Sequence, residues 1–389
     1  MKKVITLSIL FFATWGCKTR DNDSSGSRDI VWQNQEVVDL NKDSDIPIFN
    51  LIDSMEFVQL ETTDLCLIST IERVLIYKDC FYIFDQRQQT VFCFNRNGEF
   101  LRRIGEQGRG PQEYEYLENI SIDPYNEQLL LVVPFGSVLC FDLEGNFMSK
   151  ISIPDAGAIN ELHVLDAEHW LFTSLNDYQI LYFSKKYGQL MERLFERSPK
   201  LFPLWRAYAY KDSIYFSPIL SNQTINMSNV NRQTAFSWDF GSNNNRPRRI
   251  KSLLRELQKL DNQPNIAGID KVTEAMNLRD RFLNHYIRFT RESSRYRIAV
   301  LEYKKGEYMH VVFDKQEHKT AVFRKTKEGI RWVNPDFMLN QDMVIAYDID
   351  RISNIIYTKE ILSSKQRKMV EANNPETDNP FLVVYHLKK

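Results

Sequence analysis

Residues Thr90–Phe100 read TVFCFNRNGEF, and residues Ser137–Phe147, forty-seven positions further along, read SVLCFDLEGNF. Val, Cys, Phe, Gly and a final Phe recur at matching places. Each copy contains an apolar strand, a tight turn at its Gly and the start of a second strand. A repeat of about forty to fifty residues built in this way is typical of a β-propeller, in which each repeat forms one blade. The pattern therefore predicts an all-β propeller.

The turns of the two copies position the strands of blades one and two. Asn97-Gly98 lies between apolar segments and is a strong hairpin signal, because both residues tolerate a positive φ. Glu144-Gly145 takes the same place in the second copy. Blade one is predicted to have strands at 73–77, 81–85, 90–95 and 99–104, and blade two at 120–123, 128–133, 137–142 and 146–151.

Weaker copies of the pattern predict four more blades. Met55–Glu61 has no partner before blade one, so we expect it to pair with Phe381–Leu387 in blade six and close the ring. Residues 363–379 are polar and contain a proline, which indicates a mobile excursion that could hold a short helix. The predicted strands are 162–165, 169–174, 179–184 and 189–195 in blade three, 205–210, 213–217, 224–229 and 234–240 in blade four, 296–303, 308–314 and 319–324 in blade five, and 330–333 and 343–348 in blade six.

A helical hairpin is expected between blades four and five, over about residues 245–290. Pro247 suits the first turn of a helix, and the five apolar residues from Ile250 to Leu260 fall on one face of it. A second helix is predicted from Asp270 to Tyr286. Because short helices are marginal in water, the hairpin should pack on the propeller.

The N-terminus has the features of an export signal. Lys2 and Lys3 precede the apolar stretch Val4–Ala13, which is too short to span a bilayer. Small residues precede Cys17, which predicts a lipoprotein signal at residues 1–16 and a lipidated Cys17, although Thr14 replaces the usual Leu. A plain secretory signal is the alternative. We assign residues 17–45 to a flexible tether, since Lys18–Asp29 is entirely polar, and residues 46–389 to the propeller.

Four further cysteines remain in the predicted mature chain. Cys93 and Cys140 occupy equivalent places in neighbouring blades, which are too far apart for a disulfide, so we interpret both as buried packing residues. Cys66 and Cys80 could form a disulfide in an exported protein.

A glycine-rich loop, Gly105–Tyr114, reads GEQGRGPQEY and joins blades one and two. It lacks the Lys-Ser/Thr of a phosphate-binding loop and the spacing of a dinucleotide-binding loop. One interpretation is a rigid connector in which Arg109 and Glu113 bond to the backbone. The other is that Arg109, Glu113 and Tyr114 bind a ligand at the mouth of the central channel, where the loops of all blades converge.

No pattern of a known catalytic or metal site is present. The six histidines form no dense metal motif, and a net charge of −1 gives no field that would attract nucleic acid. Acids that end strands could hold Ca²⁺ at the channel, but more often they cap turns. A metal-dependent enzyme would require several of Asp85, Asp142, His163, His310 and Asp348 to meet at one channel mouth.

The loop GRGPQEY, the segment FVQLETT, the blade pattern and the C-terminal NPFLVVYHLKK resemble one family over roughly residues 53–389. It consists of six-bladed β-propeller lipoproteins of Gram-negative bacteria, which are related to NHL-repeat propellers. The resemblance implies the fold and a location on the cell envelope, on the outer membrane with either a periplasmic or a surface orientation. It brings no catalytic residues and no cofactor.

The sequence thus predicts a membrane-anchored propeller that acts as a binding or scaffolding module for a ligand, protein or glycan. Two alternatives remain. One is a lyase or hydrolase with a metal at the central channel, and the other is an accessory subunit of an outer-membrane glycan or peptide uptake system.

Overall fold

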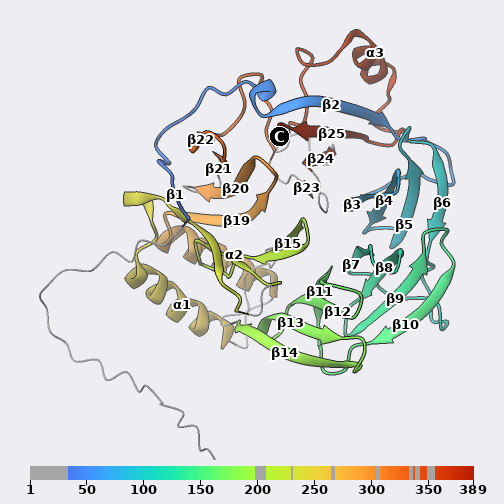
Figure 1. The fold of residues 1–389 in the computed structure, drawn as a ribbon, viewed down its shortest axis with the longest axis horizontal. Helices are drawn as coiled ribbons and strands as arrows, with labels where there is room; N and C mark the ends of the chain where they lie inside the picture. The colour runs from blue at the N-terminus through green and yellow to red at the C-terminus, as the bar shows by residue number, and fades with distance from the viewer. Residues whose placement is uncertain are drawn as a thin grey trace, which may run out of the picture. The chain divides into compact units, whose positions relative to one another are not determined.

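The computed structural model describes residues 34–197, 207–228, 231–263, 268–303, 307–332, 336–337, 342–347 and 355–389. The chain divides into two units, residues 1–32 and 33–389, and the described residues belong to the second. In that unit the strands form six sheets arranged around a central axis (Figure 1). The predicted six-bladed β-propeller is confirmed. The predicted signal peptide, Cys17 and most of the tether lie outside the described residues.

Blades one to three each contain four antiparallel strands, numbered from the axis outward (Figure 1). Blade one comprises β3 (Ile71–Tyr77), β4 (Cys80–Asp85), β5 (Thr90–Asn95) and β6 (Phe100–Ile104). Blade two comprises β7 (Asn119–Asp123), β8 (Gln128–Val133), β9 (Ser137–Asp142) and β10 (Phe147–Ser152). Blade three comprises β11 (Ile159–Val164), β12 (His169–Ser174), β13 (Tyr178–Ser184) and β14 (Gln189–Glu196).

The repeated cysteines pack inside their blades. Cys93 pairs with Tyr82 in blade one and Cys140 with Leu130 in blade two, and both are buried, as predicted. The disulfide considered between Cys66 and Cys80 is not formed, because both cysteines are free. Cys66 is instead buried with its thiol donating to the carbonyl of Glu61 at 3.1 Å, which makes it a packing residue as well.

Blade four has a fifth strand that the sequence did not reveal. Its four antiparallel strands are β15 (Ala207–Tyr210), β16 (Ser213–Phe216), β17 (Gln223–Asn226) and β18 (Thr234–Asp239). β1 (Gln35–Val37) pairs with β18 in parallel and lies at the rim. Assigning residues 34–45 to the tether was therefore incorrect, because backbone hydrogen bonds and the buried Val38 and Leu40 attach this segment to the propeller.

Blade five begins earlier than predicted. Its strands are β19 (His285–Glu292), β20 (Tyr296–Tyr303), β21 (Glu307–Asp314) and β22 (Lys319–Phe323). Tyr286 belongs to β19 and not to the second inserted helix, which ends at Phe282. The error arose because the apolar residues on either side of the helix end continue the helical spacing, so the change to an extended strand left no gap in the pattern.

Blade six joins the two ends of the propeller domain. From the rim inward it contains β2 (Ile52–Gln59), β25 (Phe381–Leu387), β24 (Met343–Tyr347) and β23 (Asp336–Phe337). The predicted pairing of β2 with β25 is confirmed, with Phe57 opposite Val383. The strand predicted at 330–333 is wrong for its described residues, since Ile330 and Trp332 are buried in an irregular connection.

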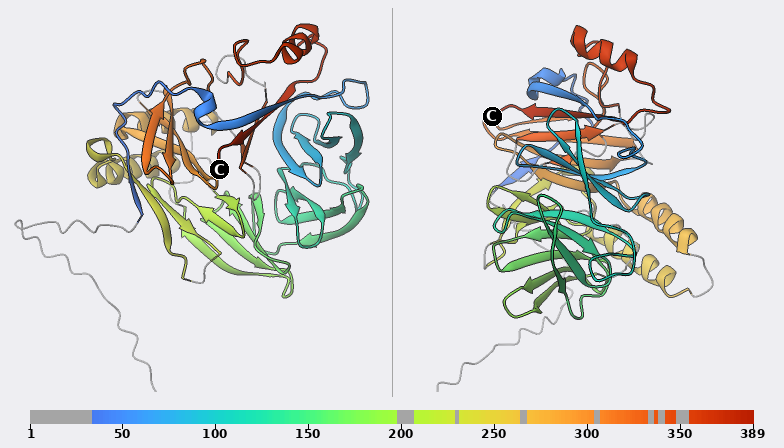
Figure 2. Two further views of the ribbon diagram at one scale, coloured as in Figure 1. Left: turned by 45° about the horizontal axis from the view of Figure 1, so that its top comes forward. Right: turned by 90° about the vertical axis from the view of Figure 1, so that its right-hand side faces the viewer.

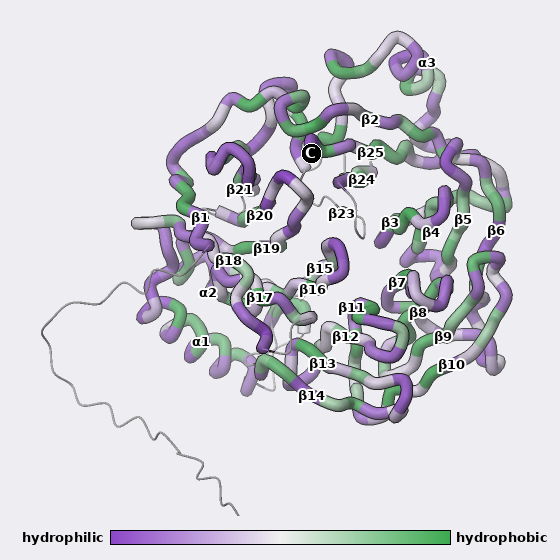
Figure 3. Tube along the Cα trace, viewed as in Figure 1, coloured by the Kyte–Doolittle hydropathy of each residue, from purple (hydrophilic) through white to green (hydrophobic). Residues whose placement is uncertain are grey.

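The core consists of apolar wedges between neighbouring blades. Phe84 of blade one, for example, packs in the same cluster as Leu129 and Leu131 of blade two. Comparable clusters lie between each of the remaining five pairs of neighbouring blades. Apolar residues follow the strands, and the turns between them are mostly polar (Figure 3). The stability of the ring therefore depends on packing between blades as well as within them.

Helices α1 (Pro247–Asp261) and α2 (Gly268–Phe282) form the predicted hairpin, and α3 (Ser364–Ala372) lies in the segment between β24 and β25. Helices α1 and α2 project from one face of the ring, opposite the C-terminus, whereas α3 lies at the outer rim beside blade six (Figure 1, Figure 2). Leu253 and Leu257 of α1 pack on Ala275 and Leu278 of α2. Two short 3-10 turns complete the structure, at Ile48–Asn50 and Gly241–Asn243. None of the helices in the described part of the chain is both long and apolar enough to span a bilayer.

Candidate functional site

The inner strands of several blades bring charged residues together around the central axis. Arg73 of β3 donates to Glu161 of β11, with 2.8 Å between Nη1 and Oε1. The Nε2 atom of His163, also on β11, lies 3.7 Å from the second carboxylate oxygen of Glu161. The side chain of Glu161 is only 3% exposed. A buried carboxylate is thus held between residues of blades one and three.

Blades four and five contribute to the same region. The guanidinium of Arg291, on β19, lies 5.6 Å from the ring centroid of Tyr208 on β15. Burial alone would raise the pKa of Glu161, but His163 and Arg73, followed by the charge of Arg291, outweigh this effect and lower the pKa to about 2. The carboxylate is therefore ionised throughout the physiological range.

Several buried polar atoms of these strands have no hydrogen-bond partner within the described protein. Buried polar groups in folded proteins are nearly always paired, and leaving one unpaired costs about 1–3 kcal/mol. Such atoms gathered around one axis mark a place where a polar ligand or water can be bound. They are Asn160 Oδ1, Glu161 Oε2, His163 Nε2, Tyr208 OH and Thr290 Oγ1.

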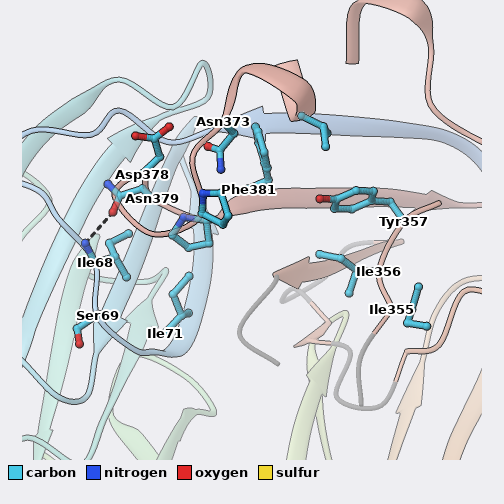
Figure 4. Close-up of a pocket in the computed structure, with 13 residues that line it drawn as sticks. Ile68, Ser69, Ile71, Ile355, Ile356, Tyr357, Asn373, Asp378, Asn379 and Phe381 are labelled. Carbon is cyan, nitrogen blue, oxygen red and sulfur yellow. Dashed lines mark hydrogen bonds between the residues drawn. The ribbon is translucent and has the colours of Figure 1, made fainter. Parts of the chain in front are cut away.

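A pocket of about 460 Å³ lies where blade six meets blade one (Figure 4). Ile71, the first residue of β3, lines this pocket, and Arg73 of the channel follows two positions later on the same strand. The segment that carries α3 supplies the opposite wall, through Val370, Asn373 and the residues from Pro375 to Pro380 that line the pocket. Most of the lining residues are apolar by type, but polar atoms supply more of the exposed lining than apolar atoms do, and Ser69, Asn373, Asp378 and Asn379 have polar side chains there.

The rim of this pocket is held in place by Asn379. Its side-chain amide donates to the carbonyls of Glu61 and Cys66 and accepts from the backbone N–H of Ile68 at 2.7 Å (Figure 4). Asn373, in contrast, has a buried side-chain oxygen without a partner in the described protein. The pocket therefore combines a fixed rim, several apolar side chains and an available polar group.

The glycine-rich loop holds its predicted site residues apart. Tyr114 is buried between blades one and two, where its hydroxyl donates to the carbonyl of Gln89 at 2.8 Å. The carboxylate of Glu113 accepts from the backbone N–H of Gly110 at 2.7 Å. The exposed side chain of Arg109 pairs with Glu115. This arrangement matches the rigid-connector interpretation for Glu113, whereas Arg109 bonds to a carboxylate and not to the backbone.

The role of Arg109, Glu113 and Tyr114 in ligand binding remains a prediction. Most residues of the channel were missed: of the five residues considered from the sequence for a channel mouth, only His163 is among the described channel residues. Glu161 was placed just outside the strand predicted at 162–165, and Arg73, Tyr208 and Arg291 lie on other blades. An inward-facing acid beside a predicted inner strand was the one signal that could have indicated Glu161.

Among the residues considered for a metal site, those that the structure describes do not meet. Asp85 caps the turn after β4 by accepting from the backbone N–H groups of Thr70 and Gln88. Asp142 bonds to Asn146 in a hairpin turn, and His310 is stacked on Phe323 in blade five. Asp348 lies outside the described residues. The described part of the chain contains no group of three or more His, Cys, Asp or Glu side chains arranged to hold a metal ion.

The fold and its polar channel define a six-bladed β-propeller with a candidate ligand site at one end of the central axis. The chain belongs to the family described as "Domain of unknown function (DUF4934)", which matches residues 35–386.

Two of the solved structures with a similar fold come from Bacteroides species. A protein of Bacteroides fragilis, described as a "putative exported protein", is 17% identical, with a TM-score of 0.69 over 91% of this chain and 99% of its own. A member of the DUF4221 family from Bacteroides vulgatus is 9% identical, with a TM-score of 0.50 over 87% of this chain and 97% of its own. At these identities the likeness shows the fold alone. No curated protein matches the chain.

Proposed function

We propose that this protein is a lipid-anchored binding module of the bacterial cell envelope, which holds a small polar ligand at one end of its central channel. The observation that carries the proposal is the set of buried, unpartnered polar atoms on β11, β15 and β19. Unpartnered buried atoms also occur elsewhere in the described protein, for example Trp170 Nε1 and Ser184 Oγ, but those of β11, β15 and β19 belong to the innermost strands of three blades. A ligand that supplies the missing hydrogen bonds accounts for their retention.

The available groups suggest the class of ligand. Glu161 and Asn160 offer oxygen acceptors, whereas the hydroxyls of Tyr208 and Thr290 can both donate and accept. A sugar or a short peptide presents the matching mixture of O–H, N–H and carbonyl groups. The pocket of about 460 Å³ between blades six and one, which shares β3 with the channel through Ile71, falls within the range of roughly 300–1,000 Å³ for small-molecule sites.

The location on the envelope is supported by two observations. The N-terminal segment has the charge and length of an export signal followed by Cys17, and a structurally similar protein from Bacteroides fragilis is described as exported. We include in the proposal a thioether-linked lipid on Cys17 and membership among the lipoprotein propellers related to NHL-repeat proteins. The same location and ligand class would suit an accessory subunit of an outer-membrane glycan or peptide uptake system.

Ligand binding can be tested by thermal unfolding of the purified propeller with a panel of envelope-derived sugars and dipeptides. At least one compound should raise the melting temperature of the wild type, and Tyr208→Phe should reduce that shift. Tyr178→Phe, at a half-exposed position of blade three, is the matched control. Equal shifts in both variants, or no shift with any compound and no small molecule released on denaturation, would count against the channel as the site.

The anchor needs a separate experiment. Wild-type protein expressed in a Bacteroides host should fractionate with membranes and require detergent for release, and Cys17→Ser should appear in the soluble envelope fraction. Intact mass spectrometry of the mature wild type should give a chain that starts at a lipid-modified Cys17. A mature chain with an unmodified N-terminus would refute the anchor and leave the channel proposal intact.

A further inference from the structure

A second candidate binding site follows the outer edge of blade six. β2 is the outermost strand of this blade and pairs only with β25 among the described strands. Its other edge borders a groove of about 830 Å³. Consecutive residues of β2, from Met55 to Gln59, line the groove, so that both faces of the strand and the backbone between them border it. The hairpin turn Arg96–Glu99 and helix α3 form its remaining walls.

A free strand edge offers backbone donors and acceptors in a regular row. Such an edge can accept a further strand, and proteins commonly cover or protect edges that must not do so. Blade four provides a precedent within this chain, because its outermost antiparallel strand, β18, accepts β1 as a fifth, parallel strand. Blade six has an edge of the same kind, bordered by a groove, and no described strand occupies it.

Helix α3 forms the outer wall of the groove without belonging to the core. None of its residues is buried, and its start is fixed by a capping box between Ser363 and Gln366. A helix of nine residues is marginal in water unless one of its faces is covered. Met369 and Gln366 of α3 line the groove, so a molecule bound there would cover part of this face. The helix is thus placed as a clamp beside the strand edge.

The lining determines which strand would fit. Met55, Phe57 and Met369 offer apolar contacts, and Phe57 is fixed by its ring contact with Phe381 at 4.5 Å. The charged members are unbalanced in favour of acids. Glu56 pairs with Arg96 at 2.6 Å, which leaves Glu61, Glu99 and Asp378 against Lys365 among the charged residues that line the groove.

We propose that this groove binds an extended peptide segment of a partner protein as the fifth strand of blade six. The segment spans about five residues, matching Ser54 to Val58, and alternates apolar side chains with Lys or Arg. Backbone hydrogen bonds to β2 provide the affinity, and the acidic lining selects a basic strand. The site is distinct from the central channel, and its test is independent of the ligand proposed there.

The test uses a deuterated, ¹⁵N-labelled propeller and an alternating lysine–valine heptapeptide as the probe. Addition of the peptide at millimolar concentration should shift the amide signals of residues 54–59 and protect the outward-facing amides from hydrogen exchange. The control is the same peptide with alternate backbone amides N-methylated, which keeps its charge and side chains but removes strand pairing. We expect binding of the methylated peptide to be weaker by about tenfold or more.

Two protein variants identify the groove. Met369→Trp fills it with a neutral side chain and should weaken binding by about tenfold. Ala372→Trp places the same residue on α3 outside the groove lining and should leave the affinity within about twofold. Equal binding of the two peptides, an unchanged affinity of Met369→Trp, or the absence of shifts at residues 54–59 with the unmodified peptide would overturn the proposal.

Discussion

The connector at residues 105–114 and the central channel are both rich in polar side chains. They differ in whether the buried polar atoms have hydrogen-bond partners. In the connector, Glu113 bonds to Gly110, and the hydroxyl of buried Tyr114 bonds to Gln89. In the channel, oxygen atoms of Glu161 and Tyr208 are buried without such partners in the described protein. The connector is therefore built for the fold. The channel also contains paired groups, such as Glu161 Oε1 with Arg73, but it retains individual polar atoms that have no partner in the described protein.

This difference changes where function should be sought. The glycines and proline drew attention to the connector in the sequence. These residues are explained by the tight backbone turns of the connector. The channel has no local motif, because its members come from blades one, three, four and five. Substitutions in the connector should therefore reduce stability, and those at unpaired channel atoms should reduce ligand binding.

The largest effect is expected for Tyr114→Ala. The ring of Tyr114 fills the wedge between blades one and two, so its removal leaves a cavity and unpairs the carbonyl of Gln89. The free energy of unfolding should fall by about 3–5 kcal/mol, the range for a large aromatic residue in a core. Urea denaturation measures this loss. A loss below about 1 kcal/mol would mean that Tyr114 is not part of the core. The contrast between a stabilising connector and the channel would then fail.

The pH dependence of Glu161 tests the channel. Its folded-state pKa of about 2 lies below the ordinary value of 4.5, so the ionised carboxylate contributes stability that is complete above pH 4.5 and is lost as the pH falls through 2. The shift corresponds to about 3 kcal/mol. The stability difference between the wild type and Glu161→Gln should therefore shrink across this range in urea denaturation. A difference that stays constant with pH would show that Glu161 is not held ionised by its neighbours.

A smaller effect is expected from Gly108→Ala. A Cβ at this position would lie 2.0 Å from the Glu113 carboxylate oxygen, which would have to move and lose its hydrogen bond to Gly110. The expected cost is about 1 kcal/mol. Gly268→Ala, at the start of α2, is the control, because the added Cβ meets no atom within 4 Å. Equal losses in the two variants would argue against a rigid connector.

Much of the fold could be predicted because it is encoded locally. The Asn97-Gly98 turn and its counterpart Glu144-Gly145 fix hairpins over a few residues, and the resulting strands agree closely with β5 and β9. The closure by β2 and β25 was also accessible, since an apolar strand without a partner at each end of the domain must be paired. Periodicity and turn chemistry are sufficient for such elements.

The remaining elements depend on contacts that no local pattern records. β1 has three residues and becomes a strand only through β18, about two hundred positions away. β19 was hidden because apolar residues continue across the end of α2 at helical spacing. The channel has the same origin, since Arg73 and Glu161 are 88 residues apart and meet only once the ring is closed.

The central claim is that the paired polar atoms of the connector stabilise the fold, whereas the unpartnered polar atoms of the channel do not. The most direct measurement is the free energy of unfolding, by urea denaturation, of two variants that each lose one buried hydroxyl. Tyr114→Phe breaks the bond to Gln89 and should cost about 1 kcal/mol, whereas Tyr208→Phe removes an unpartnered hydroxyl and should cost nothing or stabilise the protein. A larger loss for Tyr208→Phe than for Tyr114→Phe would contradict the account.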